Sequence, residues 1–539
     1  PSYEQAMHGP LRDGYIEACQ KEYDTLEAMG VWEVVSREPW MNVLPCVWAL
    51  RRKLYPNGLV KKLKARICAG GHRQKEGIDY FDVYSPVVSW STVRLLLIVS
   101  ILMNLATLQI DFTSAFVHAD IDKPPDFDQL TPEQQSRQGV FMEMPKGFSQ
   151  PGKVLKLKKS LYGLKQAPMV WFNHLKSKLE HAGFVQCVDV DQCLFVSDKV
   201  ILLCYVDDCL LYAQNQEDIQ EVVQKLRDQK MQLEEESSVE GFLGVDIHRN
   251  KTAGTITLTQ RGLINRIIEA LGVEDLPSVS TPADRILHKD ENGDPATGDF
   301  NYASVIGMAW YLYGHSRSEL GFALSQASRF THSPRRSHEL ALIRIGQYLK
   351  GTRDKGMILR PTALDHLVMD CWCDSNFVGL HGKEPRTDPV SVKSRTGFVI
   401  CLNHCPLVWC SKLQESIALS TMMAEYYALS TALRDVLPLR DLVTTVSKAV
   451  GIPEEHLSTF KVTCWEDNVG ALTLANLVPG QNTPRSKHYD VKVHWFRSHL
   501  CKDKLEVLKI DTKDQLADLF TKPLPPEVFI PLREKLMGW

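Results

Sequence analysis

The sequence lacks a hydrophobic run long enough to cross a lipid bilayer, which takes about 18 to 20 apolar residues. Its longest apolar runs are Val93–Ile101, which Arg94 interrupts, and Val200–Val206. Runs of this length are typical of strands or helices inside a protein core. We therefore expect no membrane partner for this chain.

Closely spaced cysteine pairs are scarce. The 14 cysteines are scattered along the chain, and no Cys-x-x-Cys pair occurs among them. A zinc site is not expected, because no set of ligands has a usual spacing. A disulfide framework is not expected at this chain length and cysteine density either. We interpret the cysteines as free thiols in a reducing compartment.

The chain has no strong net charge, since 62 Lys and Arg nearly balance 65 Asp and Glu. Three stretches are nevertheless basic. Residues 51–75 hold nine Lys or Arg and no acid, residues 153–165 hold five Lys and no acid, and residues 485–504 are also rich in Lys, Arg and His. Such stretches favour a polyanion bound at several places. The alternative is three solvated surface faces.

A chain of 539 residues is expected to hold about three to four compact units. No internal repeat or low-complexity tract occurs in it. It begins with Pro1, so we interpret it as a piece of a longer polypeptide or a trimmed form. The polar segment 122–139 predicts a surface insertion, and 284–300 predicts a linker.

The apolar pattern predicts the main helices and strands. Helices are expected at 1–30, 90–106, 171–181, 263–271, 303–330, 338–350, 420–449 and 513–521. Strands are expected at 32–35, 47–50, 109–112, 254–258, 367–374, 397–402, 406–411 and 461–465. The pair Asn57-Gly58 predicts a hairpin turn, and 195–213 predicts a hairpin with acids at its tip.

Two adjacent carboxylates, Asp207 and Asp208, lie between an apolar segment that ends at Val206 and another that begins at Cys209. Crowded or buried carboxylates have raised pKa values unless a cation compensates. In proteins that cation is commonly a divalent metal held by hard oxygen ligands. Asp111, at the end of an apolar strand, is a third acid, and three acids can hold two magnesium ions. The alternative is an exposed Asp-Asp turn.

Four further acids each lie beside an apolar segment in the C-terminal third: Asp374, Glu425, Asp467 and Asp518. If they converge at the ends of strands, they can hold two metals that activate water and stabilise the departing 3′-oxygen of RNA. Any one of them alone is more often a helix cap or a solvated acid. The occurrence of all four acids, each beside an apolar segment, favours a catalytic role for the set.

The acids stand within motifs that resemble the reverse transcriptase–ribonuclease H portion of copia-type (Pseudoviridae) LTR retrotransposon Pol polyproteins, over nearly the whole chain. The polymerase motifs are Lys64-Ala65-Arg66, Gly77–Tyr80, Ser85-Pro86-Val87, Gln109-Ile110-Asp111, Met142–Pro145, Leu161–Pro168, Tyr205–Asp208 and Phe242-Leu243-Gly244. The ribonuclease H motifs are Asp374–Gly379, Ser394–Gly397, Trp409–Gln414, Ala424-Glu425-Tyr426, Asp467-Asn468, Ser486–Asp490 and Ala517-Asp518 with Thr521–Leu524.

The resemblance implies an α/β and α+β multidomain fold: a right-hand polymerase with fingers, palm and thumb, a connection, and a ribonuclease H-like α/β domain. We expect an N-terminal helical extension at 1–45, fingers and palm at 46–250, a thumb at 251–300, a connection at 301–365 and a ribonuclease H domain at 366–539. It also implies that the chain copies RNA, and then DNA, into DNA and cuts the RNA of RNA–DNA hybrids.

The resemblance further implies roles for individual residues. The expected metal-binding catalytic residues are Asp111, Asp207, Asp208, Asp374, Glu425, Asp467 and Asp518. Nucleotide contacts are expected from Lys64, Arg66, Phe116, Tyr162, Gly163 and Gln166, where Phe116 would exclude a 2′-hydroxyl. Primer or template contacts are expected from Lys165, Leu243, Gly244 and His488. For Lys64 and Arg66 the alternative is a solvated hairpin, and for Phe116 a core position.

The expected cofactor is Mg²⁺, two per active site, with Mn²⁺ as an alternative ion. The expected partners are an RNA template, a DNA primer, RNA–DNA hybrid, dNTPs and a parent polyprotein with integrase. The expected location is the cytoplasm, within virus-like particles, with later nuclear entry. The segment 123–139 is longer than in the family, and Met423 replaces an acid of the common pattern. Met423 leaves open a polymerase with an inactive nuclease, and a non-catalytic nucleic-acid-binding relic is a further alternative.

Overall fold

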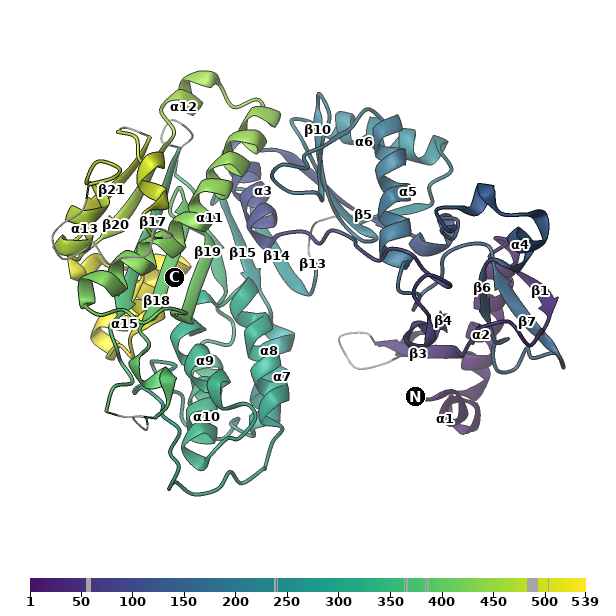
Figure 1. The fold of residues 1–539 in the computed structure, drawn as a ribbon, viewed down its shortest axis with the longest axis horizontal. Coiled ribbons are helices and arrows are strands. Elements are labelled where there is room, and N and C mark those ends of the chain that lie inside the picture. Colours follow the sequence, from purple (N-terminus) through teal and green to yellow (C-terminus); the bar gives the residue numbers. More distant parts are fainter. Residues whose placement is uncertain are drawn as a thin grey trace.

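The computed structural model describes residues 1–54, 60–236, 239, 241–362, 364, 367–382, 384, 387–481, 493–502 and 504–539. The chain forms several units of mixed helix and strand, which follow one another from the N-terminus at the right of Figure 1 to the C-terminus at the left. This confirms the predicted α/β and α+β multidomain fold class. The predicted turn at Asn57-Gly58 lies outside the described residues.

The N-terminal unit combines helices, a small sheet and a long hairpin. Its helices are α1 (Tyr3–His8) and α2 (Arg12–Ala28). The sheet has the order β1 (Trp32–Ser36), β7 (Lys153–Leu157), β6 (Val140–Met142) and β2 (Val43–Leu44). The hairpin joins β3 (Cys46–Leu54) to β4 (Val60–Ala69), against which α2 packs. The helix predicted over 1–30 is therefore two helices, because Gly9 and Pro10 interrupt it.

The predicted insertion at 122–139 is a surface segment. None of its described side chains is buried, and it contains the short helix α4 (Pro132–Arg137). Thr131 begins this helix with a capping box, in which its hydroxyl accepts from the backbone N–H of Gln134.

The central sheet carries the first acidic site. Its strand order is β12 (Leu233–Glu236), β5 (Ala106–Phe112), β11 (Asp208–Ala213), β10 (Val200–Tyr205), β9 (Leu194–Val196) and β8 (Val185–Gln186). Helices α3 (Trp90–Leu102), α5 (Ala167–His181) and α6 (Gln216–Asp228) accompany it, and α6 packs on β5 and β11. Strands β10 and β11 are buried along their length except at the ends that carry Tyr205 and Asp208.

The helix predicted over 90–106 ends at Leu102, so the prediction was wrong for the last four residues. Asn104 adopts a left-handed conformation with φ 47°, and the N–H of Leu105 donates to the carbonyl of Ser100. Asparagine tolerates this conformation, which commonly ends helices. Ala106 then begins β5, which leads to the first of the predicted metal ligands.

A third sheet links the middle of the chain to a helical bundle. Its order is β13 (Gly241–Phe242), β14 (Val245–Asn250), β15 (Thr255–Thr259) and β16 (Met357–Leu359). The helices are α7 (Arg261–Leu271), α8 (Tyr302–His315), α9 (Gly321–Ala327) and α10 (Arg336–Gly351). The helix predicted over 303–330 is broken at 316–320. The predicted boundary between 250 and 251 falls in the β14–β15 turn, and all the domain boundaries remain predictions.

The C-terminal unit is a mixed five-stranded sheet with the order β19 (Cys405–Leu413), β18 (Arg395–Leu402), β17 (Val368–Asn376), β20 (Lys461–Glu466) and β21 (Leu505–Lys509). The first three strands are antiparallel, whereas β17, β20 and β21 run parallel. The long helix α11 (Thr421–Ala449) packs on β17 and β18. The other helices are α12 (Glu454–Ser458), α13 (Val469–Ala475), α14 (Asp518–Thr521) and α15 (Pro526–Met537).

The helix predicted over 513–521 was wrong for most of its length. Only the four residues of α14 are helical there, after a 3-10 turn at Thr512–Asp514 and the extended residue Gln515. The final helix α15 was missed, although Pro526 at its first turn is a typical helix start. In the described part of the chain, no helix is both long and apolar enough to pass through a bilayer.

Helix α3 joins the central sheet to the C-terminal unit through the buried Arg94. Its guanidinium donates from Nε to the carbonyl of Leu407 in β19 at 2.8 Å and from Nη1 to the carbonyl of Gly314 at 3.1 Å. It also lies 4.2 Å from the centre of the Trp409 ring. Burial lowers the pKa of Arg94 to about 9. A buried cation therefore ties three parts of the molecule together.

Two candidate active sites

Strand register brings the first three acids to one end of the central sheet. Asp111 in β5 is the Cα partner of Asp208 in β11, and Asp208 pairs with Tyr205 across the β10–β11 hairpin. Asp207 lies at the hairpin tip, where its carbonyl accepts from the N–H of Phe112 at 3.0 Å. The backbone register therefore brings all three residues that the sequence singled out as polymerase metal ligands to the same end of the sheet, although their carboxylate oxygens do not all lie within 4.8 Å of one another.

The hairpin tip contains a strained residue. Val206 has φ 54°, a left-handed conformation that a β-branched residue adopts only when its surroundings enforce it. The indole N–H of the buried Trp171 in α5 donates to the Val206 carbonyl at 2.6 Å. Strain of this kind costs about 1–3 kcal/mol and occurs often at functional sites. Trp171 therefore helps hold the turn that carries Asp207 and Asp208.

The three acids repel one another in a partly buried setting. Burial, followed by the charges of Asp207 and Asp111, raises the pKa of Asp208 to about 6. Burial, and then the charge of Asp207, also raises the pKa of Asp111. Crowding of this type is relieved by a bound cation. The excess negative charge of these three carboxylates favours the binding of a divalent metal ion.

Two glutamates near this site were missed by the sequence analysis. Glu234 in β12 is the Cα partner of Asp111, and Glu236 lies further along the same edge strand. Both side chains are exposed, and their charges add to the rise in the pKa of Asp111. In the sequence they belong to a short acidic run, which is more typical of a solvated face. Only the strand pairing places them beside the predicted ligands.

Basic residues from the first hairpin and aromatic residues from two later segments lie near the acids. Arg66 in β4 lies with its guanidinium carbon 4.7 Å from the centre of the Tyr162 ring. Tyr162 in turn makes an edge contact with Phe116, with ring centres 4.9 Å apart. The charge of Lys64, also in β4, lowers the pKa of Asp111. Four of the predicted nucleotide-binding residues therefore cluster around the first acidic site.

The loop that carries Tyr162 and Gly163 packs closely on the end of β4. Gly163 has φ 91°, and a Cβ atom at this position would lie 2.2 Å from the carbonyl oxygen of Ala69. The N–H of Ala69 donates to the carbonyl of Tyr162 at 2.7 Å. Glycine is required here by both backbone conformation and space.

Gln166 is fully buried, and both ends of its amide bond inside the protein. Its Nε2 donates to the carbonyl of Asp79 at 2.8 Å, and its Oε1 accepts from Nε2 of Gln74 at 2.9 Å. Gln166 therefore supports the loop, and its predicted contact with a nucleotide remains untested. The neighbouring Lys165 is more accessible, and its Nζ donates to the hydroxyl of Tyr80 at 3.3 Å.

The turn predicted to hold the primer connects β13 to β14. Leu243 and Gly244 both have positive φ, 52° and 71°. The hydroxyl of Tyr311 donates to the carbonyl of Leu243, and Nε2 of Gln109 donates to the carbonyl of Gly241 at 3.1 Å. Because Gln109 lies two residues before Asp111 on β5, it ties this turn to the first acidic site. His488, the other predicted primer or template residue, lies outside the described residues.

The second group of acids converges in the C-terminal unit. Asp374 lies on the central strand β17, Glu425 in the second turn of α11, and Asp467 directly after β20. One oxygen atom from each of these three lies within 4.8 Å of the others, and among the described residues no other set of acids, His or Cys forms such a group. Asp518, the first residue of α14, is joined to Asp374 through Lys522, whose Nζ contacts both carboxylates.

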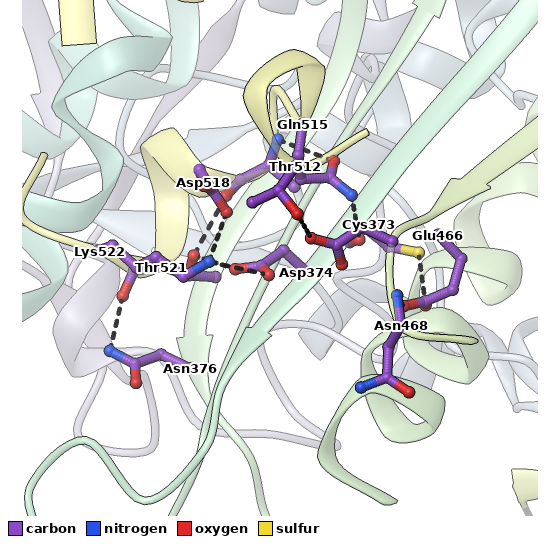
Figure 2. A network of polar contacts seen from close by, with 12 residues as sticks. Cys373, Asp374, Asn376, Glu466, Asn468, Thr512, Gln515, Asp518, Thr521 and Lys522 are labelled. Carbon is purple, nitrogen blue, oxygen red and sulfur yellow. Dashed lines mark hydrogen bonds and ion pairs between the residues drawn. The ribbon is translucent and has the colours of Figure 1, made fainter. Parts of the chain in front are cut away.

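A polar network holds Asp374, Asp467 and Asp518, and Figure 2 labels Asp374 and Asp518 within it. Thr521 donates to Oδ2 of Asp374, and Lys522 contacts Oδ1 of Asp374 at 3.2 Å and Oδ1 of Asp518 at 2.7 Å. Thr512 donates to Oδ2 of Asp467 at 3.0 Å. The short segment around α14 therefore supplies one acid and the groups that orient two others.

Burial and mutual repulsion raise the pKa values of these acids strongly. Burial, then the charge of Asp374, raises the pKa of Glu425 to about 11 and that of Asp518 to about 7. Burial also raises the pKa of Glu466 to about 8. Glu466 was missed by the sequence analysis, because it reads as a strand residue next to the more prominent Asp467. It is fully buried, and its Oε1 accepts from the N–H of Asn468 at 2.9 Å.

The donor set fits a divalent metal ion. It consists of carboxylate oxygens, the hard ligands that such ions prefer. The Oε2 atom of Glu425 is buried and has no hydrogen-bond partner within the described part of the protein. A buried carboxylate oxygen without a donor is costly unless a cation contacts it. Asp374, Glu425 and Asp467 could therefore hold a metal ion.

Met423, which departs from the family pattern, does not disturb this group. Its side chain is buried, and its sulfur lies 3.4 Å from the backbone N–H of Leu419 at the start of α11. Ser420 caps the same helix by accepting from the N–H of Met423 at 3.2 Å. Met423 therefore packs beneath the helix start, and Asp374, Glu425 and Asp467 still approach one another.

Comparison with known proteins relates the first site to a family. A model of the family described as "Reverse transcriptase (RNA-dependent DNA polymerase)" matches residues 29–285, which include Asp111, Asp207 and Asp208. A solved foamy viral protease–reverse transcriptase in complex with double-stranded DNA has a TM-score of 0.49 and 14% identity, and covers 92% of this chain and 69% of that one.

Two relatives are Pol polyproteins of plant transposons. The retrovirus-related Pol polyprotein from transposon TNT 1-94 of Nicotiana tabacum is 28% identical over 100% of this chain and 39% of its own length. That from transposon RE1 of Arabidopsis thaliana is 30% identical over 92% of this chain and 32% of its own length. The chain thus spans about a third of the length of these relatives. The predicted relationship is confirmed: residues 29–285 match the reverse transcriptase family model, and the chain is similar along its length to retrotransposon Pol polyproteins.

Proposed function

We propose that this chain is an RNA-directed and DNA-directed DNA polymerase that also cleaves the RNA strand of RNA–DNA hybrids. The observation that carries the proposal is the pairing of Asp208 with Asp111 across two buried strands, with Asp207 at the adjoining tip. This arrangement lies inside the segment that matches the reverse transcriptase family. A second carboxylate group stands in the C-terminal unit, ready for a separate hydrolytic reaction.

In the polymerase site the three acids would hold divalent cations, Mg²⁺ by proposal, two per site, with Mn²⁺ as an alternative. Such ions supply the positive charge that activates the attacking hydroxyl and stabilises the leaving group in phosphoryl transfer. Arg66 and Lys64 would bind the triphosphate of a dNTP, since a guanidinium offers paired donors to phosphate. Phe116, supported by Tyr162, would lie under the sugar and exclude a 2′-hydroxyl.

In the C-terminal site the proposed ligands are Asp374, Glu425, Asp467 and Asp518, again with Mg²⁺. Thr521 and Thr512 orient Asp374 and Asp467 through the hydrogen bonds described above. The proposed substrate is RNA–DNA hybrid, which proteins recognise through shape, phosphate and 2′-hydroxyl contacts. Because such contacts are largely ionic, binding is expected to weaken steeply with salt.

A polymerase with an inactive nuclease is the second candidate, since Met423 replaces an acid of the family pattern. The position of Met423 argues against it, because the residue packs under the start of α11 and leaves Asp374, Glu425 and Asp467 close together. A non-catalytic relic is disfavoured for a similar reason. All seven predicted metal ligands remain acidic.

One experiment separates these candidates. The full chain is assayed with Mg²⁺ for primer extension on an RNA template and for cleavage of a labelled RNA–DNA hybrid. We expect Asp208→Asn to abolish extension and leave cleavage, and Glu425→Gln to abolish cleavage and leave extension. A wild-type chain that extends but never cleaves would favour the second candidate, and one that does neither would refute the proposal.

We further propose that the chain acts as part of a larger polyprotein product with an integrase, in cytoplasmic virus-like particles whose contents later enter the nucleus. The support is the kind of relative it matches, since these are much longer Pol polyproteins. Fractionation of cells that express the parent polyprotein would test this proposed location. Extension activity should sediment with particles that also contain template RNA, and soluble activity free of RNA would contradict it.

A further inference from the structure

Lys522 lies inside the second acidic site. Its Nζ is 2.7 Å from Oδ1 of Asp518 and 3.2 Å from Oδ1 of Asp374, so one ammonium bridges two proposed metal ligands. Figure 2 shows it between these two carboxylates. Asp374 and Asp518 have only 2% and 8% of their side chains exposed. The Lys522 ammonium therefore offsets a substantial part of the negative charge of these two buried carboxylates.

The lysine covers only one side of the acidic group. Asp374, Glu425 and Asp467 approach one another within 4.8 Å, and Oε2 of Glu425 has no donor in the described structure. Among the described residues, Lys522 forms no hydrogen bond or ion pair with Glu425 or Asp467, although its charge acts to lower the pKa of Glu425. This side therefore stays open to a cation. The site is thus divided at Asp374, with an open side toward Glu425 and Asp467 and a lysine-occupied side toward Asp518.

The local backbone allows the lysine to leave without moving the acids. Asp374 is held from its other oxygen by Thr521, whose carbonyl accepts from Nδ2 of Asn376 at 3.2 Å. These contacts anchor the end of α14 to β17. The Lys522 side chain itself is 34% exposed, so part of it already lies in contact with solvent. A flexible four-carbon stem on an anchored backbone suits a group that exchanges between two positions.

An ammonium and a divalent ion cannot share the same carboxylate oxygens at close range, because like charges repel strongly in a partly buried site. We propose that Lys522 is a built-in cation that occupies the Asp374–Asp518 side of the site when no metal is bound there, and that it must swing out before a second divalent ion can bind. The first ion binds on the open side. Lys522 is then a positioning residue that sets the affinity for the second ion. This inference rests on the proposed metal-binding function of the cluster.

The test is Mn²⁺ binding to the full chain, measured by isothermal titration calorimetry and by melting temperature against Mn²⁺ concentration. All variants also carry Asp208→Asn, which reduces the contribution of the polymerase site to the measured Mn²⁺ binding. Lys522→Met is compared with Lys535→Met, a matched variant whose lysine pairs with Asp514 at 3.0 Å, outside the acidic group. Glu425→Gln serves as the variant that removes a ligand from the open side.

We expect Lys522→Met to bind the second Mn²⁺ at least about tenfold more tightly than the parent, because one opposing charge is gone. Without metal it should melt lower than Lys535→Met, and saturating Mn²⁺ should close most of that gap. A Lys522→Met variant that is unfolded without metal but folds with Mn²⁺ would also support replacement of the ammonium by a divalent ion. Unchanged Mn²⁺ affinity, or a melting deficit that is the same at every Mn²⁺ concentration, would overturn the inference, as would a variant that no Mn²⁺ concentration folds.

Failure of the underlying function gives a different result. If the parent shows no Mn²⁺ binding that Glu425→Gln removes, the cluster is not a metal site and the proposed nuclease function fails. If the parent binds Mn²⁺ and Glu425→Gln loses that binding, while Lys522→Met behaves like Lys535→Met, the metal site stands and only the role of Lys522 is wrong.

Discussion

The substitution Trp171→Phe tests whether the hairpin tip that carries Asp207 and Asp208 is held by tertiary structure. Trp171 is 1% exposed, and its indole N–H donates to the carbonyl of Val206, the residue with a left-handed backbone. Phenylalanine keeps a ring in contact with Phe112, whose ring centre lies 5.5 Å away, but removes the donor. The change therefore acts mainly on the turn.

The expected magnitude follows from the lost hydrogen bond. Removing the donor and leaving the Val206 carbonyl unpaired costs about 1–2 kcal/mol. Because the left-handed valine is already strained by a similar amount, the turn should shift toward relaxed conformations that misplace the two acids. With a factor of ten for about 1.4 kcal/mol, nucleotide addition should slow about 5- to 30-fold.

The assay is single-turnover primer extension, with hybrid cleavage by the same preparation as the internal reference. Trp495→Phe is the matched control, because that indole N–H donates to Ser430 at 3.1 Å in the C-terminal unit. We expect Trp171→Phe to slow extension and spare cleavage, and Trp495→Phe to leave extension unchanged. Wild-type extension by Trp171→Phe, or an equal loss of both activities, would refute this account of the turn.

Three further predictions concern stability. The pKa of Asp208 is raised to about 6, so the folded metal-free chain binds a proton more tightly than the unfolded chain, and its stability falls as pH rises from about 4 through 6. After a discount for partial exposure, the loss amounts to roughly 1–2 kcal/mol. Asp208→Asn should flatten the pH dependence of the melting temperature measured in EDTA across this range, and an unchanged slope would contradict the assignment of this pKa to Asp208. Arg94→Met should lower the free energy of unfolding by about 2–4 kcal/mol, because it removes charge-assisted bonds to Leu407 and Gly314, and urea titration that finds less than 0.5 kcal/mol would argue against Arg94 as a tie between units. Gly163→Ala should cost about 2–4 kcal/mol through its backbone strain and its overlap with the Ala69 carbonyl, as read from thermal melts, and a neutral effect would show that the loop is free to shift.

The parts of the sites that were predictable follow from local pattern. Asp207 and Asp208 between two apolar runs predict a hairpin with acids at its tip, and a buried strand that ends near Asp111 is the natural neighbour. The structure places Asp111 opposite Asp208, as this reasoning requires. Likewise, acids at the ends of β17 and β20 are brought together because parallel neighbours end at the same edge of a sheet.

Other features depend on tertiary contacts that leave no local signal. The hydrogen bond from Trp171 to Val206 joins residues 35 positions apart, and tryptophan in a helix reads simply as core. Gln166 lies in a motif that suggests ligand contact, yet its amide is used internally by Gln74 and the Asp79 carbonyl. Lys522 reads as part of a C-terminal motif, and only the fold shows that its ammonium reaches Asp374, 148 residues earlier.

The most direct test of the two-centre account is a crystal structure of the full chain with primer–template, a non-reactive dNTP analogue and Mn²⁺, with anomalous scattering used to locate the ions. We predict Mn²⁺ peaks in contact with Asp111 and Asp208 at one centre and with Asp374, Glu425 and Asp467 at the other. Ordered nucleic acid and nucleotide with no Mn²⁺ peak beside Asp111 and Asp208 would contradict the central claim.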